Sequence, residues 1–479
     1  MGKKSIVRNS IFNVVYKGFT ALFPLLTTTY IARVLLPDGV GKVAYANTIV
    51  SYFVTIAALG LPNYGVKAIA QNDTSHKDRG KTFQELFIIN FVSTLICIFT
   101  YYLLVNSVAH FMNRRMLFNV MGILLILNIF NIDWFFQGIE EYSYIATRSI
   151  IIKIISFVTM LIFVKTRNDY LIYALILCLA TSGNYILNAI VLKKYIKFQR
   201  VKLSFKKHLR PVFILLASTL ATEIYTMLDT VMIEYYHGEV YVGYYSNVVK
   251  IVRMIYTVTI AMVATFYPRI SQYIERKDFD SSNSLLNKGI KILLIFSLPF
   301  WIGLMLTSKN VVLILFGQEY AASITTLRLM SVLIVVFSVA YFLGHLILMA
   351  SGNENKILVA TVCGAIVNAV LNIILIPIFK HNGAAFASVF AEIIVTIVLI
   401  FYGKKHFSVK LTQNFWRSEI YALLVLLISI CLIQRYSPGV ITQFVLCVLV
   451  GGTGYFFTLL LTNNELFTEF TEFIRRRHC

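Results

Sequence analysis

The sequence predicts an all-α protein that crosses a membrane many times. Hydrophobic residues make up 58% of the 479 residues and charged residues only 14%, whereas soluble domains carry about 25% charged residues. The hydrophobic residues fall in runs of about 20, which is the length that a helix needs to span a bilayer. Most Lys and Arg residues lie in the short segments between these runs, as is typical of polytopic membrane proteins.

About fourteen apolar runs follow one another along the chain. A soluble fold could not hide them, because little polar sequence is left to cover them. The span at 242–266 is the least regular, because Lys250 and Arg253 interrupt it. The runs predict transmembrane helices near residues 10–32, 41–60, 84–105, 116–137, 148–165, 170–192, 212–235, 242–266, 288–307, 322–349, 356–378, 383–402, 418–435 and 439–462.

A basic connector at residues 193–210 divides the chain. Six predicted spans precede it and six follow it, which predicts two six-helix lobes and an additional helix pair. Both lobes begin on the same side of the membrane, so the repeat is parallel rather than inverted. The predicted parts are residues 1–200, 208–402 and 415–479, the last of which includes a basic tail.

The turns before the second and eighth spans share a weak internal similarity. Residues 40–47 open the second span with Val-Gly, and residues 242–247 open the eighth span in the same way. Transporters are often built from such repeats, with the substrate bound where the repeats meet. The similarity therefore supports a two-lobe transporter architecture.

The distribution of Lys and Arg predicts the orientation in the membrane. With an even number of crossings, the segments on the side of the termini hold 27 Lys and Arg residues, and the opposite segments hold 9. Positive residues accumulate on the cytoplasmic side, so both termini are expected there. The net charge of +21 indicates contact with anionic membrane lipid. It does not indicate nucleic acid, which would need a basic patch on a soluble face.

No pattern in the sequence indicates an enzyme, a metal site or a cofactor. The chain contains no Walker A loop and no dinucleotide-binding glycine motif. Its six cysteines form no CxxC pair, and five of them lie inside apolar runs, where they act as small hydrophobic residues. The loops are also too short to form a catalytic domain. We therefore expect no catalytic residues, no metal and no cofactor.

Ionisable residues inside predicted spans are the main candidates for function. Arg253, Asp229, Glu223 and Glu392 fall near the middle of their spans, where a charge facing lipid costs about 2.5–3.5 kcal/mol. They should therefore face an internal cavity or one another. For Arg253 a cavity role and a structural ion pair with Asp229 or Glu223 are both open. For Glu392 a cavity role and a structural role are equally open.

The first span carries a polar stripe formed by Asn13, Lys17 and Thr20 at helical spacing. A polar stripe on a membrane helix is expected to face the protein interior. Pro24 interrupts this helix, which predicts a kink or hinge there.

Three further basic residues are expected to anchor helices at the membrane surface. Lys153 and Lys291 lie close to the cytoplasmic ends of their spans, so their side chains can reach the headgroups at little cost. Arg148 opens the fifth span and is expected to be an interfacial anchor.

One segment of the sequence carries a specific motif, and several others carry weaker ones. The specific segment contains Asp133, Trp134, Gln137, Gly138 and Glu140 in the pattern "DWxFQGxE". It resembles a motif of the polysaccharide flippases of the Wzx type, which belong to the multidrug/oligosaccharidyl-lipid/polysaccharide exporter superfamily. The segments 61–67, 229–233 and 243–246 resemble the regions that follow or join the second, seventh and eighth helices of these flippases, and the segments 371–377 and 382–385 resemble the wider superfamily. The resemblance covers nearly the whole chain.

The resemblance implies two six-helix lobes around a central cavity, alternating access, and a bacterial cytoplasmic membrane location. The implied substrate is an oligosaccharide on an undecaprenyl pyrophosphate carrier, turned from the inner to the outer leaflet, and the polysaccharide polymerase machinery is a further possible partner. A pyrophosphate is anionic and needs cations and hydroxyls along its path. We expect Lys17 and Arg253 to line one cavity and to meet this pyrophosphate.

Alternative functions remain open from the sequence. A cation-coupled drug exporter on the same fold would favour acidic cavity residues over Lys17 and Arg253. A lipid II flippase would share both the fold and the carrier chemistry. A membrane glycosyltransferase or polymerase would usually need acidic or His/Arg-rich outer loops, whereas the predicted outer loops are mostly a handful of residues.

Overall fold

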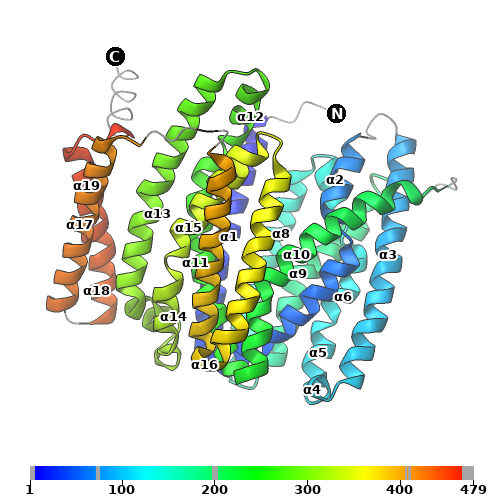
Figure 1. The fold of residues 1–479 in the computed structure, drawn as a ribbon. Helices are drawn as coiled ribbons and strands as arrows, with labels where there is room; N and C mark the ends of the chain where they lie inside the picture. The colour runs from blue at the N-terminus through cyan, green and yellow to red at the C-terminus, as the bar shows by residue number, and fades with distance from the viewer. Residues whose placement is uncertain are drawn as a thin grey trace. The chain divides into compact units, whose positions relative to one another are not determined.

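The computed structural model is a helical protein, and no strand occurs in the part of the chain that it describes (Figure 1). The described residues are 6–71, 76–196, 203–404, 407, 411–437 and 439–466, and side chains are described from Phe23 onward, apart from those at 76–78, 218, 221, 224 and 225. The prediction of an all-α polytopic protein is confirmed.

The chain forms two compact units, Met1–Gly243 and Tyr244–Cys479, called unit 1 and unit 2 below. Unit 1 contains α1 (Ile6–Ala58), α2 (Leu61–Gln71), α3 (His76–Ser107), α4 (Ala109–Met112), α5 (Arg115–Met121), α6 (Ile123–Leu127), η1 (Asn128–Phe130), α7 (Asp133–Gly138), α8 (Tyr142–Phe163), α9 (Tyr170–Leu192), α10 (Lys206–His237) and the first residues of α11 (Glu239–Ala264).

Unit 2 contains the rest of α11 and the elements that follow it. These are α12 (Tyr267–Glu275), α13 (Phe279–Leu315), η2 (Gln318–Tyr320), α14 (Ser323–Met330), α15 (Leu333–Tyr341), the π-helix η3 (Phe342–Met349), α16 (Glu354–Gly403), α17 (Gln413–Tyr436), α18 (Val440–Leu446), the π-helix η4 (Cys447–Gly451) and α19 (Gly452–Leu461). The lobes predicted at 1–200 and 208–402, with a separate pair at 415–479, stay a prediction.

Eleven helical stretches in the described residues are long and apolar enough to cross a membrane. Two helices, α1 with 53 residues and α16 with 50 residues, are longer than a bilayer requires. At 1.5 Å per residue, 50 residues extend about 75 Å, whereas the hydrocarbon core is about 30 Å thick. Each is bent in its middle and covers two predicted spans. Because α10 also covers the predicted span at 212–235, the expected number of about fourteen agrees with the structure.

The bends lie at residues with non-helical backbone dihedrals. In α1 this residue is Leu36, with φ 59° and ψ 178°, directly before Pro37. A residue that precedes proline is driven out of the α region by the proline ring, which explains the position of the bend. Pro24, where the sequence predicted a kink, has helical dihedrals within α1. In α16 the bend is at Lys380, with φ 57° and ψ −137°.

The glycines of the weak internal repeat lie close together within unit 1. A Cβ atom on Gly41 would lie 1.7 Å from the Glu239 carbonyl oxygen, and one on Gly243 would lie 2.1 Å from the Pro37 carbonyl oxygen. Neither position accepts a side chain while the two backbone segments stay this close. The shared Val-Gly sequence therefore reflects a close contact between backbones.

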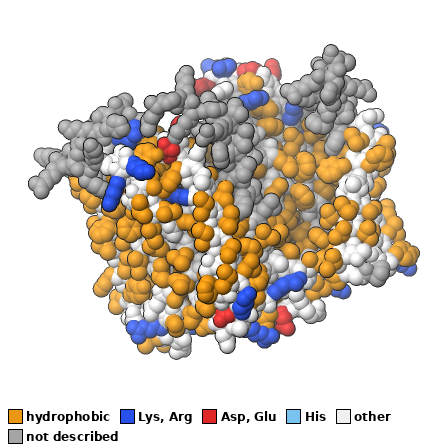
Figure 2. All heavy atoms as spheres, turned by 180° about the vertical axis from the view of Figure 1, so that it is seen from behind, with side chains coloured by type: hydrophobic (Ala, Val, Ile, Leu, Met, Phe, Trp, Pro, Cys, Tyr) orange, Lys and Arg blue, Asp and Glu red, His pale blue; other side chains and the backbone are white. Residues whose placement is uncertain are grey.

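Large hydrophobic side chains cover the outer surface of the helices. Phe99, Ile366 and Ile378, for example, are each at least 60% exposed. Figure 2 shows hydrophobic side chains over the middle of one face of the molecule, with Lys and Arg toward the margins of that face. An apolar surface of this extent marks contact with a membrane or a partner. Together with the spanning helices, it identifies a multi-pass membrane protein.

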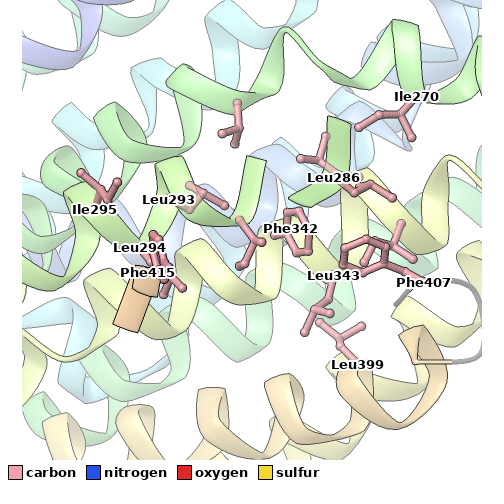
Figure 3. Close-up of a cluster of buried hydrophobic side chains, with 14 of the residues drawn as sticks. Ile270, Leu286, Leu293, Leu294, Ile295, Phe342, Leu343, Leu399, Phe407 and Phe415 are labelled. Carbon is pink, nitrogen blue, oxygen red and sulfur yellow. The ribbon is translucent and has the colours of Figure 1, made fainter. Parts of the chain in front are cut away.

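In unit 2 the C-terminal helices pack against α13. The core shown in Figure 3 includes Leu294 and Ile295 of α13 and Phe415 of α17. The half-buried Lys291 ammonium forms a salt bridge with Glu465, which follows α19. Lys291 therefore has a carboxylate partner, which the sequence did not predict, and its expected position at the headgroups stays a prediction.

Candidate functional site

Two cations lie on one face of α11. Lys250 and Arg253 are exposed and three residues apart, and a helix places residues at this spacing next to each other. Asn247 is buried one turn earlier, with its Oδ1 atom 3.5 Å from Lys250 Nζ. Thr257 follows one turn later and donates a hydrogen bond of 2.7 Å to the Arg253 carbonyl oxygen. These residues form what we call the α11 cationic face.

The α11 cationic face does not interrupt the helix. The segment Glu239–Ala264 is one α-helix of 26 residues, and Lys250 and Arg253 lie on either side of its midpoint. The sequence therefore marked this span correctly, but it gave no functional role to Lys250. Two cations this close together attract an anion more strongly than either alone.

An acidic and an aromatic residue accompany Arg253 within unit 2. Tyr256 of α11 lies within electrostatic reach of both Arg253 and Glu392. Glu392 lies on α16 and is only 6% exposed. The Tyr256 ring also packs on Phe337, with ring centroids 4.6 Å apart. Two of the four ionisable residues singled out in the sequence thus lie near one tyrosine.

The other two ionisable candidates lie on α10 in unit 1. Asp229 is buried and Glu223 is half-buried. Both lie within electrostatic reach of Tyr52 of α1, the helix on which α10 packs. The pairing of Arg253 with either carboxylate stays a prediction.

The polar stripe of the first span is described only in its backbone. Asn13, Lys17 and Thr20 lie in helical backbone of α1, but their side chains lie outside the described part of the structure. Their expected orientation toward an interior cavity, and the role of Lys17 at the substrate, stay predictions.

The family motif begins with an ion pair in which the arginine is buried and the aspartate is half-buried. Asp133 opens α7, and its Oδ1 atom lies 2.5 Å from Arg148 Nη2 and 2.5 Å from Asn188 Nδ2. Arg148 also donates a 3.2 Å hydrogen bond to the Asn184 carbonyl oxygen and is 4% exposed. The prediction that Arg148 is an interfacial anchor is therefore wrong. It is a buried partner of the motif aspartate.

The next residue of the motif fixes the packing of α7 against α2. Trp134 is 2% exposed and stacks on Phe83, with ring centroids 5.6 Å apart. A Cβ atom on Gly65 of α2 would lie 2.5 Å from Trp134 Cε3, so the indole requires a glycine opposite it. This contact gives Trp134 a packing role rather than a binding role.

The last residues of the motif end α7. Gly138 is buried, Gln137 is half-buried, and Glu140 is exposed with a φ of 58°. The motif residues thus surround a helix junction, and their observed contacts are structural.

A cluster of charged residues that the sequence did not reveal lies after α3. The Arg114 guanidinium bridges Glu234, at 2.8 Å, and Glu239, at 2.6 Å. His110 Nε2 lies 3.1 Å from Glu234 Oε2. The cluster ties the α4–α5 turn to the junction of α10 and α11. No local pattern signals it, because more than 100 residues separate the partners along the chain.

A second cluster lies toward the start of α3. Glu85 is fully buried, and its Oε2 atom contacts Lys207 Nζ at 2.9 Å and His208 Nε2 at 2.8 Å. The Tyr64 hydroxyl lies 2.8 Å from His208 Nδ1, and the Ser204 backbone N–H donates to Glu85 Oε1. Glu85 therefore holds the first turn of α10 against α3. These two clusters fasten α10 near both of its ends within unit 1.

Comparison with known families gives two matches along the chain. The family model described as "Polysaccharide biosynthesis protein" matches residues 6–274, which is more than half of the chain. A second model, MatE, matches residues 215–374. A relative from Escherichia coli (strain K12), named "Putative O-antigen transporter", is 23% identical over 409 residues, covering 84% of this chain and 97% of the relative.

Solved structures with the same fold include two kinds of transporter. The structure titled "Lipid II flippase MurJ, inward closed conformation" gives a TM-score of 0.78 at 15% identity, covering 96% of this chain and all of that chain. An inward-facing multidrug resistance MATE family transporter gives a TM-score of 0.66 at 15% identity, covering 82% and 97%. At these identities the likeness shows the fold alone. The match over more than half of the chain shows that this protein belongs to the polysaccharide biosynthesis protein family.

Proposed function

We propose that this protein is a Wzx-type flippase. It translocates oligosaccharide units linked to undecaprenyl pyrophosphate from the inner to the outer leaflet by alternating access, for the synthesis of cell-surface polysaccharide. The observation that carries the proposal is the α11 cationic face at the middle of a spanning helix. It stands in a chain that matches a relative named as an O-antigen transporter over 84% of its length.

The α11 cationic face fits the chemistry of the carrier. A pyrophosphate cannot cross hydrocarbon without compensating charge, and each exposed cation at the bilayer centre costs about 2.5–3.5 kcal/mol unless it faces water or an anion. Arg253 offers a planar fork for two phosphate oxygens, whereas Lys250 acts as a point charge. If the substrate passes along this face, the cations compensate the charge of the pyrophosphate and the pyrophosphate compensates the charge of the cations.

Binding must also be weak enough for release. Glu392 lies near Tyr256, which Arg253 also approaches, so we propose that these residues compete with the substrate for the guanidinium. A partner that the substrate must displace lowers its affinity. We propose a second cationic contact from Lys17 of the first span, with Asn13 and Thr20 beside it.

Location and partners follow from the same proposal. The excess of Lys and Arg on one side supports a cytoplasmic position for both termini, and a bacterial cytoplasmic membrane location follows from the proposed flippase function. The substrate is the lipid-linked oligosaccharide, and the polysaccharide polymerase machinery would consume the flipped product.

Other functions are less well supported. In a drug exporter that takes up organic cations, two exposed cations on one helix face would repel the substrate. A lipid II flippase would use the same pyrophosphate chemistry and would differ only in the sugars. A glycosyltransferase or polymerase on this scaffold would have to form a sugar bond, which a flippase does not.

Purified protein in lipid vesicles tests the proposal. Lipid-linked oligosaccharide is placed in one leaflet, and its appearance in the other is followed by its accessibility to a membrane-impermeant glycosidase. We expect protein-dependent translocation with no change in the sugar chain. Sugar transfer without translocation would identify an enzyme, and the absence of translocation of any pyrophosphate-linked oligosaccharide would contradict the proposal.

A further inference from the structure

A glutamate is completely buried between the C-terminal helices of unit 2. Glu419 of α17 is 0% exposed, and its Oε1 atom lies 2.5 Å from the hydroxyl oxygen of Tyr455, which is 1% exposed on α19. Its Oε2 atom is buried and has no hydrogen-bond partner. Among the described residues, no Lys, Arg or His forms a salt bridge with this carboxyl group.

The Tyr455 hydroxyl has a second partner on α13. The hydroxyl oxygen lies 2.8 Å from the carbonyl oxygen of Ile295. Ile295 belongs to the same core cluster as Phe415 of α17 (Figure 3). In a regular helix, the backbone N–H four residues later would satisfy this carbonyl. That residue is Pro299, which has no N–H to donate. The Tyr455 hydroxyl therefore stands where the missing N–H would otherwise serve the Ile295 carbonyl.

The single hydrogen of the Tyr455 hydroxyl cannot serve both Glu419 and Ile295. A tyrosine hydroxyl has one hydrogen, whereas the Ile295 carbonyl can only accept. If the tyrosine hydrogen goes to Ile295, the short contact with Glu419 needs a proton from the glutamate. An ionised Glu419 would be a buried charge with no Lys, Arg or His partner among the described residues, and burying an unpaired charge is strongly unfavourable.

We propose that Glu419 is a proton-binding site. Its carboxyl group carries a proton at neutral pH and donates a hydrogen bond to the Tyr455 hydroxyl oxygen. The Tyr455 hydroxyl in turn donates a hydrogen bond to the Ile295 carbonyl oxygen. The bound proton thereby ties α17 and α19 to the middle of α13. This inference concerns the C-terminal helices and does not depend on the proposed flippase activity.

The neighbouring titratable groups have other partners. Lys291 lies one turn before Ile295 on α13 and pairs with Glu465. Burial alone would raise the pKa of Glu465, but hydrogen bonds from Lys291 and Thr412 hold it below its ordinary value. On η4, Cys447 is a buried thiol, and α18 carries no titratable side chain. Glu465 thus provides an ionised carboxylate on the same helix pair for comparison.

Infrared difference spectra of the purified full-length protein at neutral pH test the site. Subtracting the spectrum of Glu419→Gln from that of the parent should reveal the carbonyl band of a protonated carboxylic acid. The matched control, Glu465→Gln, should remove only carboxylate bands. A Glu419→Gln difference that contains only carboxylate bands would overturn the proposal.

A second variant covers the case in which Glu419→Gln does not fold. Tyr455→Phe removes the acceptor of the proposed hydrogen bond while keeping the ring. The acid band should then shift to higher frequency, because the carboxyl proton has lost its partner. An acid band at an unchanged position in Tyr455→Phe would show that Glu419 does not donate to Tyr455.

Discussion

Two groups of charged residues in the spanning helices differ in almost every respect. Arg148 is 4% exposed and is held by Asp133 and the Asn184 carbonyl oxygen. Lys250 and Arg253 are exposed on the α11 cationic face. A buried charge that is paired with a carboxylate and hydrogen-bonded to a neighbouring helix is part of the scaffold, since removing it leaves its partner groups without their cation. Exposed cations in a membrane span indicate a path for a polar substrate.

The comparison separates the family motif from the proposed substrate contacts. The motif residues Asp133 and Trp134 fasten α7 to α8, α9 and α2. The α11 cationic face contributes little to the packing of unit 2, because its charged side chains are exposed. Variants of the first group should therefore lower stability, and variants of the second should lower activity in a folded protein.

The largest loss of stability is expected for Arg148→Ala. It leaves Asp133 without its cation, but this carboxylate is 28% exposed and keeps its hydrogen bond from Asn188. The loss should therefore lie toward the lower end of the about 3–5 kcal/mol for removing one partner of a fully buried ion pair. Arg148→Lys should cost less, because the charge survives while the second hydrogen bond is lost. The stability of both variants is measured by thermal unfolding in detergent and by the amount of membrane-inserted protein. Parental stability of Arg148→Ala would show that the pair is not part of the scaffold.

A smaller loss is expected for Gly65→Ala. The added methyl group would meet the Trp134 ring at 2.5 Å, and overpacking of a tight contact costs about 1–3 kcal/mol. Gly303→Ala on α13 is the matched control, because a Cβ atom there has no neighbour within 4 Å. In a helix interior this control should be neutral or stabilising by about 0.5–1 kcal/mol. Equal unfolding temperatures for the two variants would contradict the packing role of Trp134.

The smallest change in stability is expected for Lys250→Ala and Arg253→Ala. Both side chains are exposed, and such substitutions usually change stability by less than about 0.5 kcal/mol. Translocation should nevertheless fall in both, and Arg253→Lys should keep part of it because the charge remains without the fork. A large drop in unfolding temperature would instead place these cations in the scaffold with Arg148.

The sequence predicted the spans well because each needs only a local run of apolar residues. The span of α11 is also predicted correctly, because Lys250 and Arg253 do not interrupt the helix. The role of Arg148 could not be predicted, since its partners Asp133, Asn184 and Asn188 lie on other helices. A basic residue at the start of a span has the same sequence pattern whether it faces headgroups or a buried carboxylate.

The same limit applies to the polar clusters around α10. Glu85 and Arg114 meet partners more than 100 residues away, and nothing in their neighbourhoods along the chain signals these contacts. Glu419 lies in an apolar span, and its environment depends on Tyr455 and on the proline of a third helix. Candidate residues on one helix face can be proposed from their spacing in the sequence, whereas contacts between distant helices require the fold.

The most direct test is the translocation rate per folded molecule of the double variant Lys250→Ala/Arg253→Ala in lipid vesicles. Arg435→Ala is the matched control, because Arg435 is a cation at the end of a spanning helix that lies over the Tyr436 ring. We predict at least a tenfold loss for the double variant, equivalent to about 1.4 kcal/mol, and no loss for Arg435→Ala. A folded double variant that translocates lipid-linked oligosaccharide at the parental rate would contradict the role of the α11 cationic face.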